Sequence, residues 1–165
     1  MTGKRLPATK PSRKPSWPLD QRPGFLIRRL HQIHVALFQK TCAGFKITPL
    51  QYSLLSALAK RGTADQTTLA ADVALDRTTT TGALKRLQLR RFIERSIHHG
   101  DRRAQLCRLT KAGAKLLRQM EMSARTAHLE TVADLSKADQ KRFIAMMQQI
   151  VVANASRLEA TATID

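Results

Sequence analysis

Residues 66–109 constrain the fold more than any other part of this sequence. They begin with two short segments of helical pattern, about 66–73 and 76–91, which are joined by a tight turn. Two alternating, strand-like runs follow and enclose a polar turn at 98–103 that contains glycine and two arginines. Two close helices and then a hairpin with a basic tip are the element order of a winged helix-turn-helix. We expect the two strands at 92–97 and 104–109.

Helical patterns also precede this stretch. Within residues 25–41, apolar side chains recur at helical spacing at Leu26, Leu30, Ile33 and Leu37. The next segment has the residues of a capping box, in which the side chains of Thr48 and Gln51 each bond the other's backbone N–H. Pro49, at the first helical position, fits the same helix start. We therefore predict a second helix from Thr48 to about Gly62.

Two more helices follow the hairpin, from Thr110 to about residue 133 and from Ser136 onward. The last helix has one apolar face, formed by Phe143, Met146, Met147, Ile150 and Val151. Such a face has to pack against another apolar surface. The apolar face of the helix at 25–41 provides one, both from the same chain and from a second copy. The prediction is a mainly α fold with a small β-hairpin wing, in which a winged helix-turn-helix is joined to a helical dimerisation layer of a homodimer.

Composition divides the chain into three parts. Residues 1–23 contain five of the six prolines and many cations, so we expect a disordered basic arm that attracts phosphate or only keeps the protein in solution. Residues 48–110 form the predicted winged helix-turn-helix DNA-binding domain. Residues 24–47 and 111–165 form the predicted helical dimerisation region.

The positive charge is concentrated. The formal net charge is +17, and residues 77–118 hold twelve Lys or Arg against two acidic residues, a net +10. A basic cluster beside a nearly neutral remainder is typical of a protein that binds a polyanion, here double-stranded DNA. Charge alone does not distinguish a sequence-specific regulator from an architectural protein that binds DNA of any sequence.

Other classes of function find little support. The sequence has no glycine-rich phosphate loop, no metal-ligand spacing and no pair of acids with a plausible pocket, so we expect no enzyme activity, no cofactor and no metal. Two cysteines, Cys42 and Cys107, do not make a disulfide framework. Because no apolar run reaches membrane-spanning length and no secretory signal is present, we expect a cytoplasmic protein with no membrane partner.

Three segments carry a resemblance to a known family: ITPLQYSLLSAL, TTLAADVALDRTTTTGALKRL and IERSIHHGDRRAQLCRLTKAG. They resemble the MarR family of regulators, above all in the LT-x-x-G close and the Asp-Arg-Arg wing. The resemblance implies a dimeric, ligand-responsive transcription regulator, which we expect to be a repressor on a pseudo-palindromic operator. The family usually has glycine where Arg91 stands, so either the turn differs or Arg91 adopts an unusual backbone conformation.

A helical wheel divides the helix at 76–91 into two faces. Thr80, Ala83, Leu84 and Leu87 form its buried face. The opposite face holds small, polar and basic residues suited to base edges and phosphates, and we expect DNA contacts there from Thr78, Thr79, Thr81, Gly82, Lys85 and Arg86. A glycine costs a helix about 1 kcal/mol relative to alanine. Gly82 is explained equally well by close approach to DNA and by a crowded contact with another helix.

The wing is a second candidate for DNA contact. The resemblance implies that Asp101 orients an arginine and that one of Arg102 and Arg103 enters the minor groove. A narrow A·T groove concentrates negative potential that a guanidinium can enter. The alternative is a surface hairpin with a local salt bridge.

The first helix carries the candidate effector site. Relatives respond to small aromatic or phenolic acids, and here His34 lies on the apolar face of the helix while His31 lies at its edge. A histidine in an apolar wall can pair with the carboxylate of such an effector. The alternative is a core or interface histidine that bonds to the backbone.

A redox switch is the other regulatory hypothesis. Some relatives sense peroxide through a cysteine early in the first helix, whereas Cys42 lies at the end of that helix and Cys107 in a wing strand. Both cysteines are therefore interpreted as buried, inert thiols.

Overall fold

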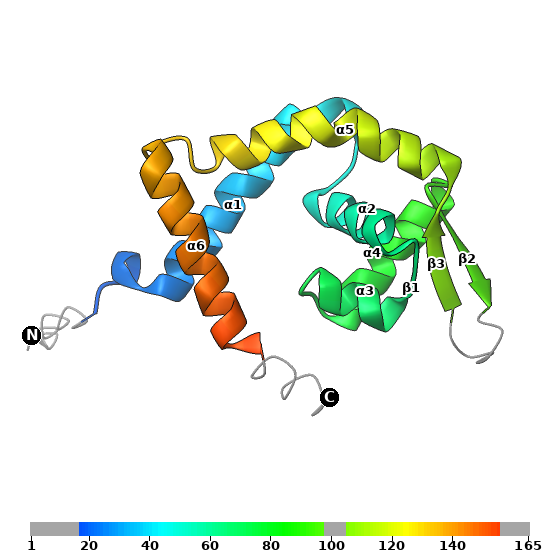
Figure 1. Cartoon of the computed structure of the whole chain (residues 1–165), viewed down its shortest axis with the longest axis horizontal. Coiled ribbons are helices and arrows are strands. Elements are labelled where there is room, and N and C mark those ends of the chain that lie inside the picture. The colour runs from blue at the N-terminus through cyan, green and yellow to red at the C-terminus, as the bar shows by residue number, and fades with distance from the viewer. Residues whose placement is uncertain (1–16, 98–104, 156–165) are drawn as a thin grey trace, which may run out of the picture.

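Residues 17–97 and 105–155 are described by a computed structural model (Figure 1). The order of elements confirms a mainly helical fold with a small winged sheet. The elements are the 3-10 turn η1 (Leu19–Gln21), α1 (Pro23–Thr41), the 3-10 turn η2 (Ala43–Phe45), α2 (Pro49–Arg61), β1 (Thr63–Asp65), α3 (Gln66–Asp72), α4 (Arg77–Leu89), β2 (Ile93–Ile97), β3 (Gln105–Leu109), α5 (Lys111–Glu130) and α6 (Lys137–Ala153).

The helices form two groups that α5 connects. The winged helix-turn-helix, which consists of α2, α3, α4 and the sheet, lies under one half of α5 (Figure 1). Along its other half, α5 packs against α1, and α6 turns back across α1. Secondary structure begins earlier than composition suggested, because residues 19–21 form a turn and α1 starts at Pro23, inside the segment assigned to a disordered arm. Residues 1–16 of that arm lie outside the described residues.

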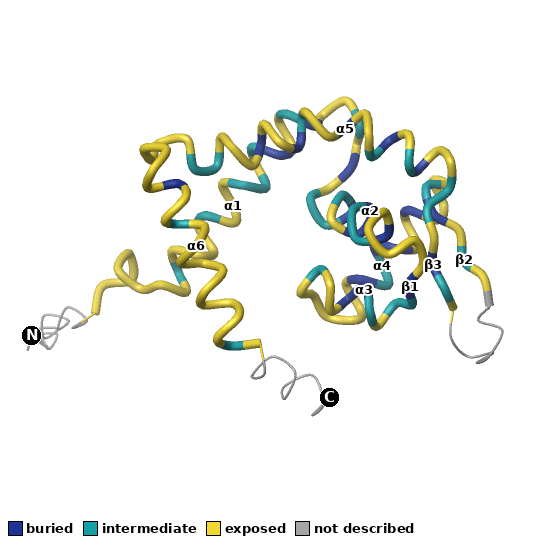
Figure 2. Tube along the Cα trace, viewed as in Figure 1, coloured by how far each residue is buried: buried dark blue, intermediate teal, exposed yellow. Residues whose placement is uncertain are grey.

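The covering of the terminal helix differs from the prediction. Within one chain α1 packs chiefly on α5 rather than on α6. Figure 2 shows that α6 and the adjoining half of α1 are mostly exposed, whereas buried residues concentrate in the winged helix-turn-helix and where α1 meets α5. The intrachain cover expected for α6 is therefore largely missing, and its apolar face lies open.

The sheet has three strands rather than the predicted two. Its order is β1-β3-β2 and both pairings are antiparallel, so that Cys107 of β3 lies between Ala64 and Arg95. With three residues, β1 is too short to show an alternating pattern in the sequence. It adds a strand to the hairpin and places the start of α3 directly against the wing.

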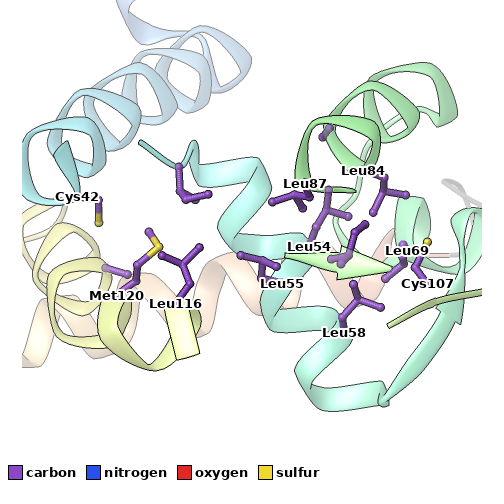
Figure 3. Close-up of a cluster of buried hydrophobic side chains, with 14 of the residues drawn as sticks. Cys42, Leu54, Leu55, Leu58, Leu69, Leu84, Leu87, Cys107, Leu116 and Met120 are labelled. Atoms are coloured by element: carbon purple, nitrogen blue, oxygen red, sulfur yellow. The ribbon is translucent and has the colours of Figure 1, made fainter. Parts of the chain in front are cut away.

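One core runs through both groups. Leucines of α2, α3 and α4 form its centre, and Figure 3 shows Cys42, Leu116 and Met120 extending it to the junction of α1 and α5. The predicted buried face of α4 is confirmed, since Thr80, Ala83, Leu84 and Leu87 are each 0% exposed. Both cysteines are buried and free, as expected, and burial raises the pKa of the Cys107 thiol.

The turn after α4 resolves the question raised at Arg91. This residue has φ +58°, in the left-handed region, which favours glycine. The second of the two alternatives is therefore confirmed: Arg91 takes the unusual conformation. α4 itself ends at Leu89, two residues before the predicted end.

None of the helices in the described part of the chain combines the length and the apolar character needed to cross a membrane.

Candidate nucleic-acid interface

Side-chain caps fix where α3 and α4 begin. Asp65 accepts a hydrogen bond from the backbone N–H of Thr68 at 2.8 Å. Asp76 accepts from both the backbone N–H and the hydroxyl of Thr79, each at 2.7 Å, and these bonds hold the pKa of its carboxyl below the usual range. Between the two helices Ala74 has φ +53°, so the chain makes a tight left-handed turn. Together these features hold α4 against α3 with its first turns facing outward.

The exposed side of α4 contains the predicted contact residues. Thr78, Thr79, Lys85 and Arg86 are exposed, and Thr81 and Gly82 are half-buried. The three threonines are not equivalent. The Thr79 hydroxyl donates to Asp76 and so belongs to the cap of α4. Among the described residues, the Thr78 hydroxyl has no protein partner.

Thr81 is engaged with a residue that the sequence analysis did not single out. Its hydroxyl donates to the backbone carbonyl of Arg77 at 2.6 Å and accepts from the side-chain amide of Gln66. Gln66 is the first residue of α3, directly after the Asp65 cap. A polar residue at that position was visible in the sequence, but nothing there indicated that it reaches α4.

The surroundings of Gly82 separate its two explanations. Among the described residues, a Cβ built on Gly82 would meet only the Nη1 atom of Arg86, at 3.5 Å, which is an ordinary contact with a flexible side chain. A crowded helix contact therefore does not account for this glycine. The other explanation, close approach to DNA, stays a prediction.

Only part of the positive charge lies on α4. Lys85 and Arg86 lie on its exposed side, while Arg90 at its C-terminus bonds the backbone carbonyls of Lys46 and Phe45. In the sheet, Arg108 forms an ion pair with Glu94 at 2.7 Å. The remaining cations in this part of the chain include Lys111, Lys115 and Arg118 on the exposed side of α5. The wing residues Asp101, Arg102 and Arg103 lie outside the described residues.

His34 and His31 line an apolar groove of about 390 Å³ between α1, α5 and α6. His34 is half-buried and stacks on His128, with ring centroids 4.6 Å apart. Its Nδ1 lies 2.9 Å from the hydroxyl of Thr131, which donates to the Ala127 carbonyl. Because that hydroxyl has a single hydrogen, neutral His34 carries its proton on Nδ1 and has a free acceptor at Nε2. Burial, followed by the nearby His128 and His31, lowers the pKa of His34.

A second groove, of about 790 Å³, lies between α2, α3 and α5. It is lined by more polar groups, among them Tyr52, Lys60 and the ion pair between Arg61 and Asp72. His128 lines both grooves. No sequence pattern indicates this groove, because its walls come from three helices whose exposed residues show no common pattern.

Comparison with known proteins gives concordant matches. The model of the MarR family matches residues 47–104. The HTH-type transcriptional repressor NicR of Pseudomonas putida is 28% identical over 151 residues, which is 92% of this chain and 96% of NicR. The crystal structure of a probable transcriptional regulator from Pseudomonas aeruginosa is 31% identical, with a TM-score of 0.76 over 81% of this chain and 99% of that chain. A structure concerning regulation of DNA binding of Bordetella bronchiseptica BpsR by 6-hydroxynicotinic acid is 30% identical, with a TM-score of 0.75 over 79% of this chain and 94% of that one.

Proposed function

The chain belongs to the MarR family of transcription regulators, and on that premise we propose that it is a homodimeric repressor that leaves its operator when it binds a small aromatic acid. The observation that carries the DNA-binding part is the exposed side of α4, where small, polar and basic residues surround a glycine whose Cβ position is approached only by the flexible Arg86 side chain. Small side chains let a helix backbone approach base edges in the major groove. In the wing, Arg102 or Arg103, oriented by Asp101, enters the adjoining minor groove.

The test is selection of binding sequences by the purified full-length protein from a random duplex library. We expect a two-fold pseudo-palindrome with half-sites about one helical turn apart. The selected duplex should outcompete random DNA by about 10³-fold or more at moderate salt. An affinity that is the same for both would instead support the sequence-independent architectural protein.

The open apolar face of α6 supports the dimer. Its exposed residues include Ile150 and Val151, each 63% exposed, and Met146, 45% exposed. On α1, Leu26, Ile27 and Ile33 are also about half exposed or more. Exposed apolar side chains gathered on one face of a helix are costly in water and are typical of an interface. A second copy offers the same surface in return, as a two-fold interface requires.

Light scattering after gel filtration tests the dimer. We expect Ile150→Glu to give monomers, because it would bury a charge in the interface. Gln148→Glu adds the same charge to the opposite side of α6 and should remain dimeric. Monomers of the unsubstituted protein would refute the homodimer.

We place the effector in the groove between α1, α5 and α6, beside His31 and His34. Its apolar wall suits an aromatic ring. The free Nε2 of neutral His34 can accept a hydrogen bond from a ring hydroxyl, and protonated His34 can donate to a carboxylate. The 6-hydroxynicotinic acid that regulates DNA binding of BpsR has a ring of this kind and is the first compound to test.

A thermal-shift screen with 6-hydroxynicotinate and other hydroxylated aromatic acids tests the effector site. Compounds that stabilise the protein should release the selected duplex, and His34→Gln should weaken both effects about tenfold or more. Lys60→Gln, in the second groove, should leave both unchanged. If Lys60→Gln abolishes the response and His34→Gln does not, the effector binds in the other groove.

A further inference from the structure

Gln66 reaches from α3 across to the DNA-facing helix α4. Its amide nitrogen Nε2 donates to the hydroxyl of Thr81 and lies 3.5 Å from the backbone carbonyl of Arg77. Both neighbours of that nitrogen are oxygen atoms that can accept a hydrogen bond, so the orientation of the amide is determined by its surroundings. Gln66 is half-buried, and the start of α3 is held in place by the Asp65 cap.

The Thr81 hydroxyl consequently has no hydrogen left for DNA. A hydroxyl has one hydrogen to donate, and that of Thr81 goes to the Arg77 carbonyl at 2.6 Å. Gln66 occupies one of its two lone pairs. These bonds leave Thr81 two groups to offer to a base, its methyl group and the second lone pair of its hydroxyl, but no hydrogen to donate.

We propose that Gln66 is a positioning residue of the DNA-reading surface: by engaging the Thr81 hydroxyl, it holds Thr81 so that its methyl group recognises a thymine. The C5 methyl of thymine lies in the major groove and makes apolar contacts with threonine methyl groups. Without Gln66, the Thr81 hydroxyl keeps only its bond to the Arg77 carbonyl, so the side chain is held less firmly and can rotate to present its hydroxyl to water or to a base. This assignment rests on the proposed function, in which α4 enters the major groove.

Replacing thymine by deoxyuridine removes only the C5 methyl, which makes it the direct test. Each thymine of the duplex selected by the wild-type protein is replaced in turn, and affinities are measured by fluorescence anisotropy. We expect one thymine in each half-site whose replacement by deoxyuridine lowers the affinity of the wild type about fourfold, the effect of one buried methyl-sized group. Thr81→Ser, which keeps the hydroxyl and lacks the methyl, should bind both duplexes equally.

Two further variants separate positioning from a general structural role. Gln66→Ala should bind the thymine and deoxyuridine duplexes with nearly equal affinity, although its Thr81 methyl group is intact. Adding Thr81→Val to Gln66→Ala should restore the preference, because valine presents a methyl group without needing a partner for a hydroxyl. The ratio of two affinities measured on one preparation does not depend on the fraction of folded protein, so a loss of stability alone cannot move it.

The outcomes are distinct. A Gln66→Ala protein with the wild-type ratio of affinities for the thymine and deoxyuridine duplexes overturns the assignment. A Thr81→Ser protein whose affinity still falls about fourfold on the deoxyuridine duplex overturns it too. A wild-type protein that selects no sequence at all overturns the proposed function together with this assignment. A wild type with a defined motif in which no thymine is sensitive to deoxyuridine overturns the assignment alone.

Discussion

A Cβ built on Gly113 would lie 2.0 Å from the carbonyl oxygen of Phe92 and 2.9 Å from its carbonyl carbon. Hydrogen bonds hold these two segments of the chain together at this point. The N–H of Thr110 donates to the Phe92 oxygen at 3.1 Å, and the Thr110 hydroxyl donates to the Arg91 carbonyl at 2.7 Å. The first turn of α5 is therefore fixed directly against the backbone that enters the wing. The atoms that a Cβ on Gly113 would meet belong to the backbone of Phe92, so no movement of a flexible side chain can make room for it.

Gly113→Ala should lower the free energy of unfolding by about 1–3 kcal/mol or more, because the backbone of one element has to move. The measurement is urea denaturation followed by circular dichroism. Gly44→Ala is the matched control, since a Cβ there meets nothing within 4 Å, and it should have little effect. An unchanged midpoint for Gly113→Ala would contradict the close contact.

Arg91→Gly should stabilise the protein. Arg91 has φ +58°, and an L-residue in that region costs roughly 1–2 kcal/mol that glycine does not. The greater freedom of glycine in the unfolded chain offsets part of this, so we expect a gain of about 1 kcal/mol. The neighbouring Arg90 has an ordinary φ of −83° and bonds two carbonyls, so Arg90→Gly should destabilise. If Arg91→Gly and Arg90→Gly lower the free energy of unfolding by equal amounts in urea denaturation, the strain at Arg91 is refuted.

Local features of this fold were predictable from the sequence because each depends on residues close together in the chain. The capping box at Thr48 and Gln51 has both of its hydrogen bonds, and Asp76, at the start of the predicted helix, caps α4. The buried face of α4 follows from helical periodicity alone. Even the left-handed residue at Arg91 could be anticipated, because the family resemblance puts glycine, the residue that region favours, at this position.

The features that escaped prediction depend on contacts between distant segments. Strand β1 is stabilised by pairing with β3, about forty residues later, and not by its own three residues. The packing of α1 on α5 was not foreseen, because an apolar stripe shows that a helix is covered without showing by what. The contact from Gln66 to Thr81 requires the angle between α3 and α4, which no local pattern encodes.

Thr80→Val should raise stability. Thr80 is 0% exposed, and its hydroxyl has no hydrogen-bond partner among the described residues. Valine has nearly the same shape without the unpaired polar atom, so we expect a gain of about 1–2 kcal/mol in the free energy of unfolding. Thr126→Val, on the exposed side of α5, removes a hydroxyl bonded to the Met122 carbonyl and should be close to neutral. A loss of stability for Thr80→Val in urea denaturation would show that its hydroxyl is satisfied.

Acid should destabilise the protein partly through His34. Burial, and then the nearby His128 and His31, lower the pKa of His34 below the ordinary 6.5, so the folded chain binds this proton less well than the unfolded chain. The contribution to stability is present above pH of about 6.5 and is lost as the pH falls toward the lowered pKa. The melting temperature of the wild type should therefore fall more between about pH 7.5 and about pH 5.5 than that of His34→Gln. Equal falls in the melting temperature of the two proteins would refute the lowered pKa of His34, because the effects of the carboxylates common to both proteins cancel in the comparison.

Gly82→Ala should make the protein more stable and a poorer DNA binder. A Cβ at this position meets only the flexible Arg86 side chain at 3.5 Å, so alanine should add about 1 kcal/mol through helix propensity. In the complex the same Cβ would stand between α4 and the bases, and we expect about tenfold weaker binding to the selected duplex, a loss of about 1.4 kcal/mol. Gly24→Ala adds a Cβ to α1 in open space and should leave DNA affinity unchanged. Denaturation and anisotropy on the same preparations measure both effects, and a Gly82→Ala protein that binds as tightly as the wild type would place this side of α4 away from DNA.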